Sequence, residues 1–419
     1  MSARSVAARY VWTDGEWKQN VAFDLGADGH IERVRAARPD ERAEACVLPG
    51  LHNAHSHAFQ WAMRGATQCL SPGHESDDFW SWREHMYGLA ATVTPEQMFK
   101  IAREAYTAMR AAGYVSVGEF HYLHHADGER PAAMAAALAD AAQRAGLPIT
   151  LIPVAYHRGG HNRPAAGAQL RFCFDDPAAF LRYVDQLRAE LAGPNVGVAV
   201  GVHSVRAVPR DWIRPIADYA TAHAAPFHIH VCEQRAEIRE CVGEHGLAPI
   251  ALLEAEGALN ERTVLVHATH LEAGDIEAIA ARRAIVCACP STEADLGDGF
   301  LEAKKMLDAS VRVCIGSDSH IVVDPAEELA MLERRARLRH ERRNVLTTAD
   351  CLRPADALMR WGAEVGAAAN GLGSGRLAVG ERFDALELPL VSADPASSLD
   401  HWLFARPTPG PARVWTEGR

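Results

Sequence analysis

The feature that most constrains this chain is an alternation of short apolar runs with longer amphipathic segments between about residues 90 and 340. Seven runs read YVSVGEF, PITLIPV, VGVAVGV, PFHIHV, TVLVHA, AIVCAC and VRVCIG, and an earlier one ends in CVLPGL. The alanine-rich stretches between them have a helical pattern: residues 95–112, 131–145, 177–191 and 209–224. Apolar strands joined by helices indicate a parallel sheet covered by helices. Eight such units predict an α/β fold, a (β/α)8 TIM barrel.

The two ends of the chain have a different pattern. Residues 8–45 alternate apolar and polar side chains between turn signals, as antiparallel strands do, and the tail after Gly371 does the same. We therefore predict that both ends form one small β-sandwich domain, residues 1–46 and 371–419. The catalytic barrel domain would then comprise residues 47–370.

Composition argues against several classes of protein. No run of eighteen apolar residues suggests a membrane span, and the first residues lack the apolar segment of an export signal. Nine scattered cysteines indicate reduced thiols, so we expect a cytoplasmic protein. A formal net charge of −11 argues against a nucleic-acid or acidic-membrane surface. An anionic substrate would consequently need specific arginines.

Histidines and carboxylates follow the apolar runs where barrel strands would end. The first run is followed by HNAHSHAFQ, the fifth contains HIHVCEQ, the sixth ends in LVHATH and the eighth in CIGSDSH. Because catalytic groups of such barrels lie at the carboxyl ends of strands, His55, His57, His230 and Asp318 are expected to converge. Nitrogen and oxygen ligands of this kind suit one catalytic Zn²⁺, and Fe²⁺, Mn²⁺ or Co²⁺ would also fit. His52, outside the His-x-His pair, is expected not to be a ligand.

These motifs together resemble the amidohydrolase superfamily, which has a His-x-His after the first strand and further ligands after the fifth, sixth and eighth. The tail segment GRLAVGERFDALEL is similar to the family's closing β-sandwich segment. Two-metal members use a carbamylated lysine at the end of the fourth strand. The four lysines here, Lys18, Lys100, Lys304 and Lys305, lie at no strand end. The resemblance therefore implies one metal ion per subunit, and it also implies a homodimer.

A narrower resemblance is carried by NAHSHAFQ, FWSWREHMY, EFHYLHH, STEADLGDG and GSDSH. These segments are similar to those of N-formimino-L-glutamate deiminases, which release ammonia and N-formyl-L-glutamate in histidine degradation. The chain departs from that family's pattern at Trp61 and at residues 155–161, AYHRGGH. The implied substrate is a small dianion.

A dianion needs cationic partners, and arginine offers a carboxylate two parallel hydrogen bonds. Arg206 follows the fourth strand and Arg83 is expected on a loop closing over the site, so both are candidate substrate-binding residues. The family resemblance adds Gln60, Tyr122 and His203.

Three residues are expected to be catalytic. Asp318 can accept a proton from water whose pKa a metal has lowered toward about 7. His267, not needed as a fourth ligand, can stabilise the charge that develops. Glu233, three residues after His230, can carry a proton to the departing ammonia.

Two alternatives remain open. One is an aminohydrolase of the same superfamily acting on a purine or pyrimidine ring such as guanine or cytosine, although a neutral ring does not require two arginines. The other is a non-enzymatic assembly protein that keeps the barrel, and such a protein should lack ligands or Glu233. Further histidines and cysteines near strand ends are expected to be structural: His121, His124, His125, Cys287 and Cys289. No role is assigned to Glu293.

Overall fold

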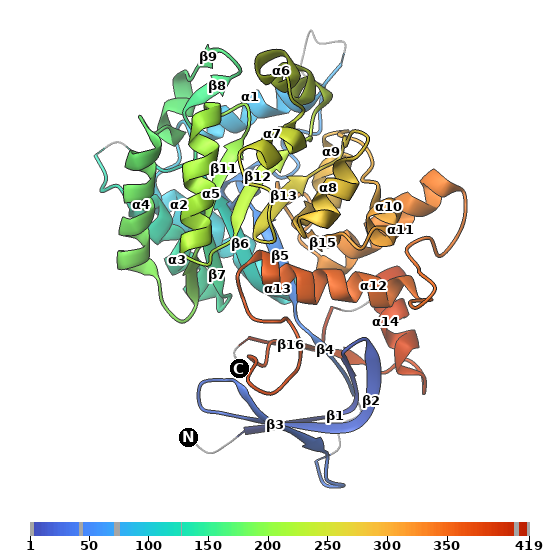
Figure 1. Ribbon diagram of the computed structural model, residues 1–419. Coiled ribbons are helices and arrows are strands. Elements are labelled where there is room, and N and C mark those ends of the chain that lie inside the picture. The colour runs from blue at the N-terminus through green and yellow to red at the C-terminus, as the bar shows by residue number, and fades with distance from the viewer. Residues whose placement is uncertain (1–3, 42–44, 71–75, 127, 406–409, 417–419) are drawn as a thin grey trace.

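The computed structural model describes residues 4–41, 45–70, 76–126, 128–405 and 410–416. Eight parallel strands form a barrel surrounded by helices, and a separate six-stranded sheet lies beyond one end of it (Figure 1). The barrel order is β15-β14-β13-β12-β11-β7-β6-β5. A bridge between Ser56 and Asp318, with a 3.0 Å hydrogen bond from Asp318 N to the His55 carbonyl oxygen, joins the first strand to the end of the last. The predicted (β/α)8 barrel is confirmed.

The barrel strands are short and buried, as their apolar runs predict. They are β5 (Leu51–Ser56), β6 (Tyr114–His121), β7 (Ile149–Ala155), β10 (Val196–Val198) leading into β11 (Val200–Ser204), β12 (Phe227–Val231), β13 (Thr263–His267), β14 (Ile285–Ala288) and β15 (Arg312–Ile315). Two further short strands, β8 (Arg158–Gly160) and β9 (Arg163–Pro164), form a hairpin after β7.

Helices cover the outside of the barrel and start at residues suited to that position. Helix α2 (Pro95–Ala112) begins after Thr94, which accepts a hydrogen bond from Gln97 N, and α4 (Pro177–Leu191) begins after Asp176. Each has a capping side chain followed by proline, and both helices span the predicted residues. The other main helices are α1 (Phe79–Ala90), α3 (Ala133–Ala145), α5 (Ile213–Ala222), α6 (Arg235–His245), α7 (Pro249–Ala255), α8 (Asp275–Ala281), α9 (Pro290–Asp295), α10 (Ala303–Asp308), α11 (Pro325–His340), α12 (Pro354–Arg360), α13 (Gly366–Ala369) and α14 (Pro395–Phe404). Short turns of other helical types are η1 (Ala58–Met63), η2 (Gly167–Phe172), η3 (Arg210–Trp212) and η4 (Trp361–Val365).

The six-stranded sheet combines strands from both ends of the chain, so the predicted small β domain is confirmed. Its order is β17-β16-β4-β1-β2-β3, and Figure 1 shows these strands together on one side of the barrel. The strands are β1 (Arg4–Thr13), β2 (Glu16–Leu25), β3 (Ile31–Ala36), β4 (Ala45–Pro49), β16 (Ala385–Pro389) and β17 (Arg413–Trp415). A separate apolar cluster that includes Val11, Phe23, Phe383 and Trp415 packs against this sheet.

The run ending in CVLPGL was expected to be the first barrel strand, and this was wrong. Its residues form β4, which pairs with β1 and β16 in the small sheet, while the first barrel strand is β5. Gly50 lies between the two strands, and a Cβ atom there would come within 2.4 Å of Val115 Cγ1. Glycine therefore lets the chain pass closely from one sheet to the other.

We propose that the first domain boundary lies at Gly50, and that the second lies near residue 371 as the sequence suggests. Residues 1–3, 42–44, 406–409 and 417–419 of the proposed small domain lie outside the described residues. No helix in the described part of the chain combines the length and apolar character that crossing a membrane would require.

Candidate metal centre and substrate pocket

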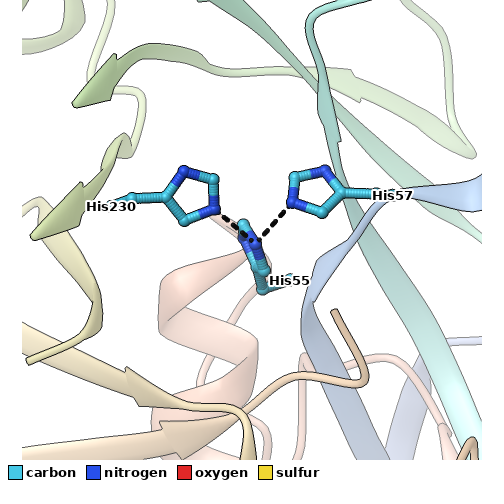
Figure 2. Close-up of side chains that lie close together, drawn as sticks. All are labelled: His55, His57 and His230. Carbon is cyan, nitrogen blue, oxygen red and sulfur yellow. Dashed lines mark hydrogen bonds between the residues drawn. The ribbon is translucent and has the colours of Figure 1, made fainter. Parts of the chain in front are cut away.

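Three histidine rings point toward one another at the carboxyl ends of the first and fifth barrel strands (Figure 2). His55 lies in β5, His57 follows it directly, and His230 lies in β12. The His55 Nε2 atom is 3.1 Å from His57 Nε2 and 3.0 Å from His230 Nε2. All three residues are buried. The predicted His-x-His pair and the strand-five histidine are thus brought together.

The hydrogen bonds behind these rings determine which nitrogen atoms carry protons. His57 Nδ1 donates to the Phe120 carbonyl oxygen and His230 Nδ1 donates to the His203 carbonyl oxygen, each over 3.0 Å. Burial also lowers the pKa of His57 to about 3, so this ring is neutral and its Nε2 atom bears a lone pair. Two lone pairs therefore face His55 Nε2, which can offer a proton to only one of them.

Lone pairs that face one another repel, and a cation bound between the rings would remove that repulsion. Neutral imidazoles whose far nitrogen atoms donate to backbone carbonyl groups are the usual histidine ligands of zinc. The donor set therefore fits a divalent metal ion.

Asp318 lies beside the three rings at the end of the last barrel strand. Its Oδ1 atom is 3.3 Å from His57 Nε2 and 3.7 Å from His55 Nε2. Burial raises the pKa of Asp318 to about 7, while the neighbouring His267 acts in the opposite direction. The residue has a φ of 44°, which is unusual for a residue other than glycine. Its backbone N–H donates a hydrogen bond to the His55 carbonyl oxygen in the first strand. The closed barrel therefore places this carboxylate within reach of the same cation.

His267 lies on the other side of Asp318, at the end of β13. Its Nε2 atom is 3.6 Å from both Asp318 Oδ2 and Glu233 Oε1. Burial disfavours the charged ring, but the carboxylates of Glu233, Glu293 and Asp318 outweigh burial and raise the pKa of His267 to about 10. The three residues that the sequence predicts to be catalytic therefore form one contiguous group.

Glu293 is a further residue of this group, and no role was predicted for it. It is fully buried on α9, and its Oε1 atom lies 3.5 Å from His267 Nδ1. The Cys289 N–H donates to Oε1 over 2.8 Å, and Arg335 Nη1 lies 3.2 Å from Oε2. Glu293 thus holds the Nδ1 side of the ring, so that Nε2 faces Glu233 and Asp318. Its position after the seventh strand was a signal that could have identified it.

A pocket opens from this group toward α1 and the β8–β9 hairpin. All five predicted substrate-binding residues line it: Gln60, Arg83, Tyr122, His203 and Arg206. Lining residues that the sequence interpretation did not identify are Tyr87, Tyr156 and Arg158. Tyr156 follows the third barrel strand directly, so the strand-end argument could have found it.

The two predicted arginines enter the pocket from different elements. Arg206 is 6% exposed, with its Nε atom 3.9 Å from Glu237 Oε2 and its guanidinium carbon 5.7 Å from the Trp80 ring centre. Arg83 was expected on a loop, which was wrong, because it lies on helix α1 and stacks on Trp80 at 4.5 Å. The Asp78 side chain caps that helix by accepting hydrogen bonds from Trp80 N and Ser81 N. This cap stabilises the start of a helix in a segment that was predicted to be a loop.

The remaining histidines and cysteines near strand ends have structural partners. His52 Nδ1 lies 2.7 Å from Ser116 Oγ, and His124 Nε2 and His125 Nε2 donate to the backbone oxygens of Val154 and Cys173. The other residues expected to be structural, His121, Cys287 and Cys289, are buried. The Cys289 sulfur and ligand-type atoms of His267 and Asp318 lie within 4.8 Å of one another.

Comparison with known proteins gives consistent similarities. The model described as Amidohydrolase family matches residues 46–419. A formimidoylglutamate deiminase of Pseudomonas aeruginosa is 40% identical over 405 residues, covering 93% of this chain and 88% of that protein. A 5-methylthioadenosine/S-adenosylhomocysteine deaminase of Natronomonas pharaonis is 29% identical over 300 residues, covering 69% and 63%.

Two solved structures extend this comparison. An amidohydrolase from Brucella melitensis has a TM-score of 0.90 at 36% identity, covering 99% of this chain and 94% of that one. An adenosine deaminase from Xanthomonas campestris with bound zinc has a TM-score of 0.81 at 22% identity, covering 99% and 92%, and this likeness concerns the fold.

Proposed function

This chain belongs to the amidohydrolase family, and from that premise we propose that it hydrolyses N-formimino-L-glutamate to N-formyl-L-glutamate and ammonia. The coarser conclusion, a hydrolase acting on a carbon–nitrogen bond, follows from the family and from the 40% identical formimidoylglutamate deiminase. The observation that carries the specific substrate is a single pocket lined by four histidines, the carboxylates of Glu233 and Asp318, and three arginines, among them Arg83 and Arg206. This reaction would be a step of histidine degradation.

We propose that His55, His57, His230 and Asp318 hold one Zn²⁺ ion per subunit. When bound, the ion would supply a Lewis acid that makes hydroxide available near neutral pH. Fe²⁺ or another divalent metal would suit the same nitrogen and oxygen donors. Metal analysis of the purified protein would identify the ion and its stoichiometry independently of activity.

The residues around the ligands can move the protons of the reaction. Asp318 accepts a proton from the attacking water while the water oxygen bonds to the formimino carbon. Glu233, which faces His267, passes a proton to the formimino nitrogen, and His267 Nε2 stabilises negative charge on the new oxygen. The carbon–nitrogen bond then breaks, and the hydroxyl proton follows the nitrogen. The proton held by Asp318 then passes to Glu233, which restores both groups, so that over one cycle two water protons leave in ammonia and the water oxygen becomes the formyl oxygen.

The substrate side of the pocket suits a dicarboxylate. Arg83 and Arg206 offer guanidinium groups, and Gln60 donates to the Tyr122 hydroxyl over 2.9 Å, which orients that hydroxyl. His203 completes the wall between these residues and His230. Buried guanidinium groups without a full set of acceptors favour anionic ligands. This arrangement favours N-formimino-L-glutamate over a neutral purine or pyrimidine ring.

The test is ammonia release by the zinc-loaded protein. N-formimino-L-glutamate would be compared with guanine, cytosine, 5-methylthioadenosine and N-formyl-L-glutamate. We expect release from the formimino compound alone, abolished by a chelator and restored by Zn²⁺. Release of ammonia from a ring compound only would overturn the substrate assignment but leave the assignment as a hydrolase intact.

The family resemblance also supports a homodimer in the cytoplasm as part of this proposal. Light scattering at several protein concentrations would measure the mass of the particle against the 45.5 kDa chain. A mass near that of one chain would overturn the dimer, and localisation of a tagged protein would test the compartment.

A further inference from the structure

One glutamine outside the predicted site connects two tyrosines of the pocket wall. Gln169, in the short helical turn η2, is largely buried. Its side-chain Nε2 atom donates to the Tyr87 hydroxyl over 2.9 Å and to the Tyr156 hydroxyl over 3.0 Å. Tyr87 comes from α1 and Tyr156 from the end of β7, and both line the pocket. Three separate elements therefore meet at this amide.

The orientation of the amide is determined by its surroundings. The Ala166 N–H donates to Gln169 Oε1 over 3.1 Å, so the oxygen atom must face Ala166. Gly159 of the β8–β9 hairpin also lies close to this oxygen, and a Cβ atom there would be 2.8 Å from it. The NH₂ group must consequently face the two tyrosines, and each of its protons serves one hydroxyl.

A hydroxyl that accepts a hydrogen bond still has its own proton to donate. Burial raises the pKa of Tyr156, and the neighbouring Tyr87 raises it further, so the phenol remains protonated. Each of the two hydroxyl protons can go either into the pocket or to the other tyrosine's oxygen. Among the described residues, that oxygen is the acceptor each proton finds outside the pocket. Even if one hydroxyl donates to the other, at least one proton points into the pocket.

Two guanidinium groups face the same region. The Nε atoms of Arg83 and Arg206 are buried and make no hydrogen bond among the described residues, although Arg206 keeps its long ion pair with Glu237. Burial lowers the pKa of Arg83, and the positive charge of Arg206 lowers it further, so the two cations repel each other. Phenol and guanidinium donors thus gather at this part of the pocket.

We infer that Gln169 is a positioning residue: it orients the Tyr87 and Tyr156 hydroxyls so that at least one of their protons faces a substrate carboxylate bound by Arg83 and Arg206. This inference rests on the proposed function for the identity of the substrate. The substrate carboxylate would accept a hydrogen bond from a tyrosine hydroxyl, while the Gln169 amide donates to the oxygen atoms of both tyrosine hydroxyls. Gln169 itself does not touch the substrate.

Two substitutions of Gln169 distinguish this role from packing. Gln169→Glu keeps the shape but places acceptors where the tyrosines receive hydrogen bonds, so their protons turn away from the pocket. We expect KM to rise about 10- to 100-fold, with kcat within about threefold, because a hydrogen bond to a charged group is being lost. Gln169→Leu removes the amide without reversing the hydroxyls, so its KM should rise less. A packing role predicts the opposite order, with the leucine variant worse.

One further variant provides a control, and two more test the tyrosine hydroxyls directly. Gln97→Glu makes the same chemical change at the exposed start of α2 and should leave both constants unchanged. Tyr87→Phe and Tyr156→Phe remove the hydroxyls without adding charge, and each should raise KM more than it lowers kcat. An unchanged KM in Gln169→Glu, or equal losses in kcat, would overturn the inference.

Calorimetric binding of glutarate separates this inference from the proposed reaction. The wild-type protein should bind glutarate, and Gln169→Glu should weaken that binding about as much as it raises KM. If N-formimino-L-glutamate is not turned over but glutarate binding still depends on Gln169, the reaction is wrong and the carboxylate site stands. If glutarate binds the wild type and Gln169→Glu equally, the positioning role of Gln169 is wrong. If glutarate binds neither protein, the carboxylate site is wrong.

Discussion

The two sides of the pocket are built differently. On the metal side, the side chains lie on or directly after barrel strands β5, β12, β13 and β15, and backbone carbonyls fix the rings of His57 and His230. On the substrate side, Arg83, Tyr87 and Gln169 lie on helix α1 and the turn η2, held by one another's side chains. The first arrangement follows from barrel geometry alone, whereas the second can change without disturbing the strands.

This difference predicts different kinetic consequences. Changes on the metal side should remove catalysis at every substrate concentration, because the reacting groups themselves are lost. Changes on the substrate side should mainly raise KM, because the reacting groups remain in place. Each variant below tests whether the two sides separate in this way.

The largest effect is expected for His57→Ala. Loss of one ligand should lower metal content and reduce kcat at least about 10,000-fold, since the metal contributes several kcal/mol of transition-state stabilisation. Metal analysis and ammonia release measure both quantities. His125→Ala, a histidine near the rim with a backbone partner, is the control and should retain both metal and activity. An active, metal-replete His57→Ala protein would remove His57 from the ligand set.

Glu233→Gln should have the next largest effect. The amide cannot carry the proton, so kcat should fall about 100- to 1,000-fold, while metal content and KM stay near those of the wild type. Steady-state kinetics with metal analysis would measure this. Glu240→Gln, at a half-buried residue of α6 paired with Arg163, is the matched control. A loss of metal alongside activity would mean that Glu233 supports the ligands instead.

Arg206→Met should instead change substrate binding. Without one guanidinium, KM for the dicarboxylate should rise about 10- to 100-fold, with unchanged metal content and a small change in kcat. Arg210→Met, at an exposed arginine paired with Glu256, serves as the control. Thermal unfolding would show whether Glu237, left without its partner, reduces stability. If turnover is unaffected, a dianionic substrate is excluded.

The smallest effect on the kinetic constants is expected at Glu328, where the change concerns stability on the metal side. Glu328 on α11 accepts hydrogen bonds from the Ser291 hydroxyl and N–H at the start of α9, and burial raises its pKa from 4.5 to about 8. The folded protein therefore binds a proton there that the unfolded chain releases above pH 4.5. Its contribution to stability is present below that pH and is lost as the pH rises toward about 8, at up to about 1.4 kcal/mol per pH unit.

Denaturant unfolding from pH 5 to pH 8 would measure this contribution. The Glu328→Gln variant should show a flatter dependence than the wild type, with kinetic constants near those of the wild type. Glu327→Gln, its half-buried neighbour paired with Arg334, should keep the wild-type slope. Equal slopes in all three proteins would mean that Glu328 is ionised in the folded state.

The same contrast explains how much of the molecule the sequence could predict. The barrel and the positions of His55, His230 and Asp318 could be inferred because strand ends mark one edge of a parallel barrel. The helix carrying Arg83 was mistaken for a loop, because its aromatic sequence lacks a clear helical period and its start depends on the cap at Asp78. Gln169 could not be found, because its contacts join elements far apart in the chain and no periodic pattern marks it.

The bridge between Ser56 and Asp318 has a consequence for the protein's synthesis. His55 and His57 leave the ribosome early, but Asp318 on the last strand is made much later, and the barrel cannot close before then. An incomplete chain would therefore offer a metal only part of the proposed ligand set. Because metal affinity depends on the folded arrangement of all ligands, loading should follow completion of the polypeptide. A translation product truncated before its eighth strand would consequently leave the cellular metal pool largely untouched.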